Sequence, residues 1–392
     1  MKQAVILAAG EGQRLRPFTV NRPKAMLAIA GKPILQYVVE ALAQNGIRDI
    51  VLVVGYHKEQ VLDYMGSGEQ LGVRLTYVTQ PKQLGTAHAL AQARGSIQGD
   101  FLTLAGDNLI EADTIASFLN IKPTAVLVKR VDDPMRYGVV TLDQRGEVKE
   151  IVEKPAEARG NLVSTGIYAF SPQIFDFIEP ELDLPDVLNK MIGQGHTIRA
   201  EETEDTWLDV IYPWDILSLN DAILRQIQAS LAGTVEAGVA LKGQVWVGKG
   251  TVIRSGSYIT GPVVIGEGCD IGPNVCILPA TSLGNNVVIS PFTQIKNSVI
   301  GDDVSIGPGG IIEDSVIDQG CIIGGHFTAC CGREEVKVDH ERHLVSVGAM
   351  LGEGCNLGSG VVAQPGAVVG NYAQVHSLKL LSGRLPDRSL VF

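Results

Sequence analysis

The second half of the chain places an aliphatic residue at every sixth position. The series is Val235, Leu241, Val247, Ile253, Ile259, Ile265, Ile271, Ile277, Leu283, Ile289 and Ile295, then, after a one-residue slip, Ile300, Ile306, Ile312, Ile317 and Ile323, and later Leu351, Leu357, Ala363, Val369 and Val375. One short repeat cannot bury its hydrophobic face alone, but stacked repeats bury a continuous core. The spacing therefore predicts a left-handed parallel β-helix over residues 232–375, with about three hexads in each turn.

Two segments depart from this period. Residues 324–345 interrupt it, and we predict a lid or a subunit-contact loop there. The interruption contains Cys330, Cys331, His340 and His343, whose irregular spacing leaves a metal site open as an alternative. Residues 376–392 lie beyond the last hexad and are predicted to be a docking segment or a frayed end.

Three other cysteines of the repeat have a structural explanation. Cys269, Cys321 and Cys355 each lie two residues before an aliphatic position of the series. Small inward side chains suit such positions, so these three cysteines are predicted to be buried packing residues. The chain has six cysteines and no C-x-x-C pair, which argues against a disulfide framework or a zinc ribbon.

The N-terminal half alternates apolar runs with stretches of helical period. The runs are Ala4–Leu7, Asp49–Gly55, Val73–Val78 and Phe101–Ala105, and the helical stretches begin near Ile34 and Lys58. Strands that alternate with helices predict an α/β domain with a mostly parallel, Rossmann-like sheet and helices on both faces. We place this domain at residues 1–231, with 214–231 as an amphipathic connecting helix. Its ligands are expected at the carboxyl ends of the strands.

Composition excludes several classes of function. The net charge of −11 argues against a general nucleic-acid binder, although a local basic pocket for phosphates remains allowed. No apolar run approaches the roughly 18 residues that a membrane span needs, and the N-terminus lacks the charged and apolar regions of a signal peptide. We therefore expect a cytoplasmic protein without a membrane partner.

A glycine-rich turn follows the first apolar run and carries the strongest signal for chemistry. Gly10 and Gly12 let backbone N–H groups approach phosphate oxygens, and Arg14 and Lys24 supply positive charge nearby. Two familiar nucleotide motifs are absent. A dinucleotide fingerprint would need glycine at Leu15, and no phosphate loop ending in Gly-Lys-Ser/Thr occurs.

The same stretch resembles the signature of the sugar-1-phosphate nucleotidylyltransferases. It reads G-x-G-x-R-L-x-P-x-T followed by R-P-K-A-M-L, with Gln13 where many members have threonine. The resemblance implies transfer without a covalent intermediate. In such a reaction a sugar-1-phosphate oxygen attacks the α-phosphorus of a nucleoside triphosphate, and pyrophosphate leaves. Catalysis of this kind depends on positioning and on neutralising charge.

The resemblance also implies a set of site residues. Arg14 and Lys24 would be catalytic, and Asp107 and Asp209 would bind Mg²⁺. The nucleotide would contact Leu7, Ala9, Gly10, Gly12, Gln80, Gly85 and Thr86. The sugar phosphate would contact Asn108, Gly138, Glu153, Lys154, Thr165 and Gly166.

Three features resemble the glucose-1-phosphate thymidylyltransferase branch. They are the G-D-N at Gly106–Asn108, the D-P-x-R-Y-G-V-V at Asp133–Val140, and aspartate rather than asparagine at Asp209. They favour dTTP, or UTP, and glucose 1-phosphate as substrates. The loop Gln83–Ala89 instead resembles that of N-acetylglucosamine-1-phosphate uridylyltransferases, which commonly carry a repeat domain. That activity, joined to a C-terminal amino-sugar acetyltransferase, is therefore an alternative.

Two further expectations concern the repeat domain and the possibility of lost catalysis. Hexapeptide-repeat proteins mostly form trimers and many are acyltransferases, so a homotrimer is expected. Bifunctional relatives use a histidine after an I-G in one coil, whereas here Pro308 follows Ile306-Gly307.

An alternative of another class is a catalytically silent subunit that senses nucleotide sugars. Such a protein would be expected to lose Lys24, Asp107 or Lys154, all of which are present.

Overall fold

The computed structural model describes residues 1–157, 160–338 and 341–392, which form two compact units. The first unit comprises Met1–Glu11, Arg22–Met26 and Ile34–Asp209, and the second comprises Gly12–Asn21, Leu27–Pro33 and Val210–Phe392. The predicted boundary after residue 231 is therefore wrong in two respects. The second unit begins at residue 210, and it also takes in residues 12–21 and 27–33 from the N-terminal part of the sequence, because these segments pack on the same unit as the repeat.

The first unit is built on a mixed sheet. Its strands are β1 (Gln3–Ala8), β4 (Asp49–Val54), β5 (Arg74–Thr79), β6 (Phe101–Ala105), β8 (Ala125–Arg130), β9 (Gly138–Leu142), β10 (Val148–Glu153), β11 (Leu162–Phe170) and β12 (Arg199–Glu202). The strand order β10-β9-β11-β6-β1-β4-β5 contains a parallel half, β6-β1-β4-β5, as the sequence predicted. In the other half β11 runs antiparallel to β6, β8 and β9. This half was not anticipated, because no helix separates most of its strands.

Helices cover both faces of this sheet, which confirms the predicted α/β class. They are α1 (Ile34–Gln44), α2 (Lys58–Met65), α3 (Thr86–Gln92), α4 (Ala112–Phe118) and α5 (Leu184–Gly193). Successive side chains of a strand point to opposite faces, and β1 shows the consequence. Ala4 and Ile6 join the core under α1, α2 and α4, whereas Val5 joins the core under α3 and α5. A strand that is buried on both faces has a continuous run of apolar residues in its sequence, as β1 does.

A second, small sheet brings two distant parts of the chain together. Strand β7 (Asn108–Ile110) follows β6 after a two-residue turn, and it pairs antiparallel with β13 (Trp207–Asp209). In this register Asp209 lies opposite Asn108. The pairing therefore fixes the end of β13 beside the turn that contains Asp107.

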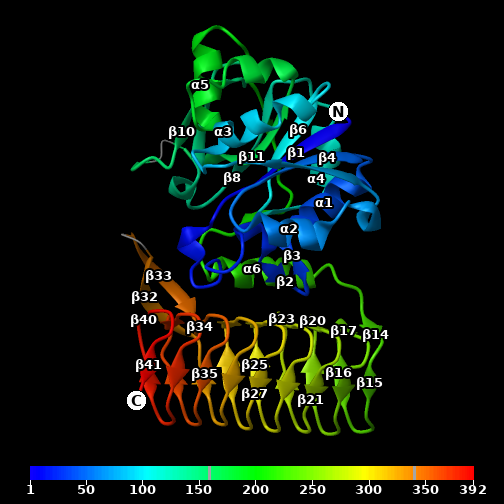
Figure 1. Ribbon diagram of the computed structural model, residues 1–392, viewed down its shortest axis with the longest axis vertical. Coiled ribbons are helices and arrows are strands. Elements are labelled where there is room, and N and C mark those ends of the chain that lie inside the picture. The colour runs from blue at the N-terminus through cyan, green and yellow to red at the C-terminus, as the bar shows by residue number, and fades with distance from the viewer. Residues whose placement is uncertain (158–159, 339–340) are drawn as a thin grey trace. The chain divides into compact units, whose positions relative to one another are not determined.

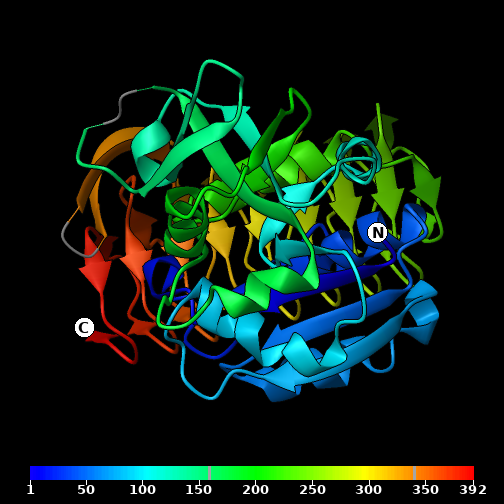
Figure 2. The ribbon, with the colours of Figure 1, turned by 90° about the horizontal axis from the view of Figure 1, so that it is seen from above.

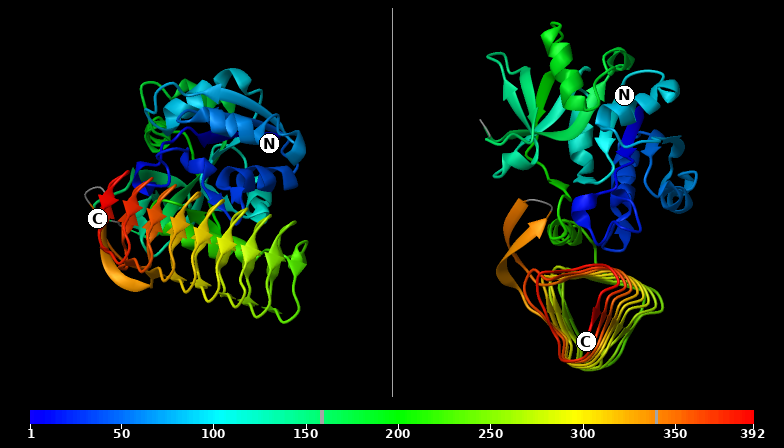
Figure 3. Two further views of the ribbon diagram at one scale, coloured as in Figure 1. Left: turned by 60° about the horizontal axis from the view of Figure 1, so that its bottom comes forward. Right: turned by 60° about the vertical axis from the view of Figure 1, so that its left-hand side comes forward.

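The second unit is the predicted left-handed parallel β-helix. Its coils are triangular in cross-section (Figure 3) and carry three parallel sheets. The first sheet contains β14 (Ser230–Leu231), β17 (Val245–Val247), β20 (Val263–Ile265), β23 (Thr281–Leu283), β26 (Val299–Ile300), β29 (Val316–Ile317), β34 (Met350–Leu351), β37 (Val368–Val369) and β40 (Arg384–Leu385). The second contains β15 (Thr234–Val235), β18 (Val252–Ile253), β21 (Asp270–Ile271), β24 (Val288–Ile289), β27 (Ser305–Ile306), β30 (Ile322–Ile323), β35 (Asn356–Leu357), β38 (Gln374–Val375) and β41 (Leu390–Val391). The third contains β16 (Ala240–Lys242), β19 (Tyr258–Thr260), β22 (Cys276–Ile277), β25 (Gln294–Lys296), β28 (Ile311–Glu313), β31 (Thr328–Ala329), β36 (Val362–Ala363) and β39 (Leu380–Leu381).

The hexad positions form the interior of the β-helix. From Val247 to Val375 each aliphatic residue of the series is at most 4% exposed and belongs to one core. Residues three hexads apart stack directly, as Ile253 does on Ile271. Cys269, Cys321 and Cys355 are buried in the same core, so their predicted packing role is confirmed.

Three expected boundaries of the repeat were wrong. The connecting helix α6 (Asp215–Leu224) ends seven residues early, because Ser230–Leu231 already pairs as a strand of the first coil. The interruption is an antiparallel pair, β32 (Gly332–Val338) and β33 (Glu341–Val347), which lies beside the last coils (Figures 1 and 2). The tail completes another coil, since Leu381 continues the six-residue spacing from Val375 and is 2% exposed.

Two shorter elements complete the second unit. Strands β2 (Ala28–Ile29) and β3 (Lys32–Pro33) pair antiparallel, and β2 packs against α6. The buried Asn220 of α6 donates from Nδ2 to the Ala280 carbonyl of the β-helix at 2.9 Å. No helix in the described part of the chain has the length and apolar character to cross a membrane.

Candidate functional site

The carboxyl ends of the parallel strands meet closely in the first unit. The Gly106 N–H donates to the Leu7 carbonyl at 2.9 Å, and a Cβ on Gly106 would fall 2.9 Å from the Ala8 Cβ. Ala9 is buried and accepts from the Tyr56 N–H at 3.3 Å. Around an added Cβ at Gly10, by contrast, no described atom lies within 4 Å. The backbone at Gly10 is thus open to a ligand, as the phosphate-turn prediction requires.

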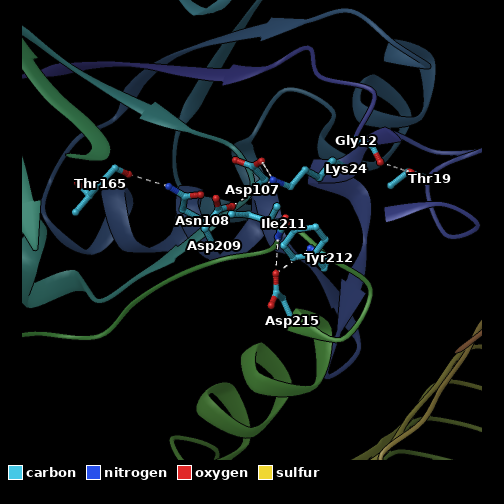
Figure 4. A network of polar contacts seen from close by, with 10 residues as sticks. All are labelled: Gly12, Thr19, Lys24, Asp107, Asn108, Thr165, Asp209, Ile211, Tyr212 and Asp215. Carbon is cyan, nitrogen blue, oxygen red and sulfur yellow. Dashed lines mark hydrogen bonds and ion pairs between the residues drawn. The ribbon is translucent and has the colours of Figure 1, made fainter. Parts of the chain in front are cut away.

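Residues 12–21, which we call the signature loop, have an ordered conformation of their own. Gly12 has a φ of 72°, which glycine adopts without strain. Its carbonyl accepts from the Leu15 N–H at 2.9 Å and from the Thr19 Oγ1 at 2.7 Å (Figure 4). Leu15 and Thr19 are buried. The loop belongs to the second unit and carries Arg14, so the structure assigns the two predicted catalytic residues, Arg14 and Lys24, to different units.

Lys24 makes ion pairs with both candidate metal ligands (Figure 4). Its Nζ contacts the Asp107 carboxylate and lies 3.2 Å from the Asp209 Oδ1. Lys24 begins a short 3-10 helix (Lys24–Met26), Asp107 follows β6, and Asp209 ends β13. All three side chains are between 17% and 22% exposed. The three predicted residues therefore form one cluster, which we call the carboxylate–lysine cluster.

Burial and electrostatic attraction have opposite effects on the pKa of Lys24. Burial alone would lower the pKa of Lys24, but attraction to Asp107 and Asp209 and hydrogen bonds with both outweigh burial and raise the pKa above its ordinary value. Lys24 therefore stays charged at neutral pH. One ammonium and two carboxylates leave a net charge of −1.

Two carboxylates are hard oxygen donors of the kind that Mg²⁺ prefers, and Mg²⁺ sites are commonly completed by substrate phosphates and water. Asp107 and Asp209 fit that description. Across the described residues no cluster of three or more His, Cys, Asp and Glu side chains could hold a metal. The alternative metal site in the interruption therefore has no support from Cys330, Cys331 and His343, and His340 lies outside the described residues.

The predicted nucleobase loop is held by contacts within the protein. Gln80 is 4% exposed, and its Nε2 contacts both the Gly85 carbonyl at 3.1 Å and the His88 Nδ1 at 2.9 Å. Both amide hydrogens are therefore engaged, which leaves the carbonyl oxygen for a base edge. His88 is a residue that sequence reasoning did not select, although it lies within the quoted loop.

Gly85 and Thr86 join this loop to α5. Gly85 has a φ of 145°, and a Cβ there would collide with the Leu182 carbonyl. Thr86 donates from its N–H and its Oγ1 to Asp183 Oδ1, at 3.0 and 3.2 Å, and its Oγ1 accepts from the Leu184 N–H at 2.9 Å. Thr86 thus links α3 to the start of α5. Nothing in the sequence pointed to Asp183, because it lies 97 positions from Thr86.

Asn108, Thr165 and Gly166 form a second group in the first unit. The buried Asn108 donates from Nδ2 to the Thr165 carbonyl at 3.0 Å (Figure 4). The Thr165 Oγ1 donates to the Leu127 carbonyl at 2.9 Å, so this hydroxyl is used within the sheet. Gly166 has a φ of 76°, and its Cα bears no side chain that would cover the Asn108 amide. The contact of these residues with a sugar stays a prediction.

Gly138 and Glu153 lie on the neighbouring strands β9 and β10, and Lys154 follows β10 directly. Glu153 pairs with Gly138 across β10 and β9, and a Cβ on Gly138 would fall 2.9 Å from Glu153 Oε2. Lys154 has a φ of 43°, donates from its N–H to the Tyr137 carbonyl, and its Nζ lies 3.8 Å from Glu153 Oε1. Partial desolvation raises the pKa of Glu153, Lys154 opposes that rise, and Asp183 and Asp186 add to it. Both side chains remain half-exposed and reachable by a ligand.

Comparison with known proteins agrees with this geometry. Residues 3–226, more than half of the chain, match the family model described as nucleotidyl transferase. The chain belongs to this family. Residues 241–346 match a second model, described as the GMPPB C-terminal domain.

Relatives of similar length share both parts. A protein of Methanococcus vannielii named bifunctional protein GlmU is 34% identical, over 99% of this chain and 97% of its own. A bifunctional sugar-1-phosphate nucleotidylyltransferase/acetyltransferase of Sulfurisphaera tokodaii is 33% identical, over 95% of this chain and 96% of its own. Among solved structures, a putative glucose-1-phosphate thymidylyltransferase from Bacillus anthracis is 30% identical, with a TM-score of 0.53, and covers 58% of this chain and 97% of its own.

Proposed function

We propose that this nucleotidyl transferase moves a nucleotidyl group from a nucleoside triphosphate to a sugar 1-phosphate. The carboxylate–lysine cluster carries the proposal, since it joins one cation to two carboxylates that are candidate metal ligands. In the first unit Asp107 follows β6, and Gly10 follows the neighbouring parallel strand β1. A relative that is named as a sugar-1-phosphate nucleotidylyltransferase and matches 95% of this chain supports it.

The reaction needs positioning and charge neutralisation more than proton transfer. Because the attacking sugar phosphate is already ionised, it needs no general base. Lys24 would bind the triphosphate oxygens on which charge develops, and Arg14 would do so from the signature loop. Lys154 would bind the sugar phosphate while Glu153 accepts from sugar hydroxyls. Mg²⁺ held by Asp107 and Asp209 would neutralise phosphate charge.

For the substrates we propose UTP and N-acetylglucosamine 1-phosphate, in place of the expected dTTP and glucose 1-phosphate. Relatives that match the full chain are named bifunctional, and one pairs nucleotidylyl transfer with acetyl transfer. That pairing matches the alternative of the sequence analysis. The thymidylyltransferase from Bacillus anthracis matches little more than the first half. One methyl group separates dTTP from UTP, which a pocket distinguishes by only about 1–3 kcal/mol.

The test is pyrophosphate release from UTP, dTTP, GTP, CTP and ATP, each with N-acetylglucosamine, glucose or mannose 1-phosphate and Mg²⁺. Highest turnover with UTP and the acetylated sugar supports the proposed pair. Highest turnover with dTTP and glucose 1-phosphate would restore the thymidylyltransferase assignment. Product binding without turnover in every combination would point to the silent sensor subunit.

Acetyl transfer is the second candidate, on the strength of the bifunctional relatives. The β-helix offers His326, whose ring lies 2.8 Å from the Cβ that Gly309 would carry in the preceding coil. Thiol release from acetyl-CoA with glucosamine 1-phosphate measures this activity, and His326→Ala tests whether His326 takes part.

Lys154→Ala is expected to raise the KM for the sugar phosphate by about 10- to 100-fold, which corresponds to the loss of one charge-assisted hydrogen bond. The KM for the triphosphate should stay nearly constant. Steady-state kinetics with each substrate varied in turn provide the measurement. Lys149→Ala is the matched control, since Lys149 is an exposed residue of β10, the strand that Lys154 follows. Equal changes in both KM values would show that Lys154 does not hold the sugar phosphate.

We also propose that the β-helix assembles the chain into a homotrimer. Large apolar side chains stand out at the turns between its second and third sheets, where Phe292 is 71% exposed and Leu378 is 82% exposed. Ultracentrifugation should give three times the mass of 41.8 kDa. Phe292→Asp combined with Leu378→Asp should give a monomer, and an unchanged trimer would place the interface elsewhere.

A further inference from the structure

The last coils of the β-helix hold the signature loop by direct hydrogen bonds. Asn371 donates from Nδ2 to the Pro17 carbonyl at 3.1 Å. At the end of the loop, Asn21 donates from Nδ2 to Glu353 Oε2 at 2.9 Å. The approach is close, since a Cβ on Gly352 would fall 3.0 Å from the Pro17 Cβ. The loop and these coils belong to the same compact unit.

Asn371 is the centre of this attachment. It is 2% exposed, and its backbone N–H, its backbone carbonyl, which accepts from the Arg388 N–H at 2.7 Å, and both side-chain polar atoms have partners. Its N–H donates to Asp387 Oδ1 at 2.8 Å, its Oδ1 accepts from the Glu353 N–H at 2.8 Å, and its Nδ2 donates to Pro17. A buried amide is costly unless it is hydrogen-bonded. The Pro17 carbonyl is therefore the partner that makes burial of the Asn371 amide tolerable.

An equivalent asparagine occurs in an earlier coil. Asn285 also accepts at Oδ1 from the N–H of the preceding coil, from Glu267 at 2.8 Å, and donates from its N–H to Asp302 Oδ1 at 2.7 Å. Asn285 therefore makes the same two bonds between coils as Asn371. The difference is the third bond of Asn371, which goes to the loop and not to the β-helix.

The interruption of the repeat provides a second attachment, at Arg14. The Arg14 Nη2 lies 3.7 Å from Glu341 Oε1 on β33. The other oxygen of Glu341 accepts from the Tyr212 hydroxyl at 2.5 Å and lies 3.3 Å from His343 Nε2. Tyr212 is itself fixed, because its N–H donates to Asp215 Oδ2 at 2.8 Å (Figure 4). The hydrogen bond from Tyr212, together with electrostatic attraction from Arg14 and His343, holds the pKa of Glu341 below its ordinary value, so this carboxylate is ionised.

We propose that the β-helix is a positioning element for nucleotidyl transfer. Asn371 fixes the signature loop, and Glu341 orients the Arg14 guanidinium. The expected effect of Glu341 on the kinetics rests on the proposed function, because it takes Arg14 as a ligand of the triphosphate. The attachment of the signature loop to the β-helix, which we call the seating of the loop, does not depend on any activity. Glu341 and Asn371 are positioning residues, since they act through the loop.

The first experiment compares Asn371→Asp with the matched control Asn285→Asp in the full chain. Ionised aspartate keeps the two bonds between coils but has no donor for the Pro17 carbonyl. Trypsin cleavage after Arg14 requires the loop to open, because Leu15 is 1% exposed. Mass spectrometry of the fragments should show cleavage at Arg14–Leu15 faster by roughly tenfold or more in Asn371→Asp, as expected for an unsatisfied hydrogen bond. The control should match the unmodified protein.

The second experiment compares Glu341→Gln with Glu335→Gln. Glu335 lies on the neighbouring strand and pairs with Arg342 at 2.9 Å, so it controls for loss of a charge from β32 and β33. Glutamine can still accept from Tyr212 but does not attract Arg14. We expect a severalfold rise in the KM for the triphosphate in Glu341→Gln alone, with the KM for the sugar phosphate unchanged.

Equal cleavage rates in the Asn371 and Asn285 variants would overturn the seating of the loop. Equal kinetics in the Glu341 and Glu335 variants would overturn the orientation of Arg14. An inactive parent protein would refute the proposed function instead, and the cleavage experiment would still decide the seating. If Asn371→Asp does not fold, Asn371→Ala with Asn285→Ala gives the same comparison, since alanine also removes the donor.

Discussion

Asp107→Ala should reduce turnover by at least about a hundredfold, the loss that follows removal of one group that stabilises transition-state charge. The carboxylate follows β6, contacts the Lys24 ammonium and shares the cluster with Asp209. Its removal takes away one of the two proposed Mg²⁺ ligands and leaves Asp209 as the ion-pair partner of Lys24. Pyrophosphate release at saturating substrates and Mg²⁺ measures the effect.

Asp107→Asn tests the negative charge alone, because asparagine has nearly the same size as aspartate but is neutral. We expect the same loss of turnover, with a melting temperature near that of the parent. Asp113→Ala is the control, because Asp113 is an exposed residue of α4 in the same unit. Substantial Mg²⁺-dependent turnover in both Asp107 variants would remove Asp107 from the site.

Lys24→Met should destabilise the protein as well as inactivate it. The substitution removes the Lys24 ammonium, which contacts both of the largely buried Asp107 and Asp209 carboxylates. Breaking a buried ion pair costs about 3–5 kcal/mol. Because the cluster is partly exposed, we expect the free energy of unfolding to fall by about 3 kcal/mol. For a unit of about 200 residues this lowers the melting temperature by roughly 6–12 °C. Differential scanning calorimetry without a divalent cation gives the measurement.

Mg²⁺ should restore part of this stability. In Lys24→Met no Lys24 ammonium competes with a metal ion for the two carboxylates, whereas in the parent Lys24 contacts both. Magnesium ions should therefore raise the melting temperature more in Lys24→Met than in the parent or in the surface control Lys149→Met. No gain with Mg²⁺ in Lys24→Met would argue that Asp107 and Asp209 do not form a metal site. This readout is independent of catalysis.

The location of Arg14 changes how the two halves of the chain are understood. The sequence presents a catalytic domain followed by an accessory repeat. In the structure, residues 12–21 belong to the unit of the β-helix, and Asn371 and Glu353 hold them there. A truncation before the last coils would therefore remove the support of the signature loop. Loss of activity in such a truncation would not by itself show that the β-helix has an activity of its own.

Features encoded in local spacing could be predicted from the sequence. A six-residue period leaves few ways to bury its aliphatic residues, and the β-helix follows from it together with the buried positions of Cys321 and Cys355. Apolar runs separated by helical stretches gave the parallel half of the first sheet. The glycine turn and the family signature indicated Lys24, Asp107 and Asp209, and the structure brings these three together.

Other features depend on contacts between residues far apart in the sequence, which no local pattern records. The bond from Thr86 to Asp183, the pairing of Asp209 with Asn108, and the bond from Asn371 to Pro17 are of this kind. The prediction for residues 376–392 was wrong because the turn after Leu381 is shortened. The last strands therefore do not keep the six-residue spacing from Leu381. The sequence by itself determined the two architectures and the chemical groups of the site. Only the tertiary structure decided which unit holds the signature loop, because that depends on where a buried asparagine amide finds its acceptor.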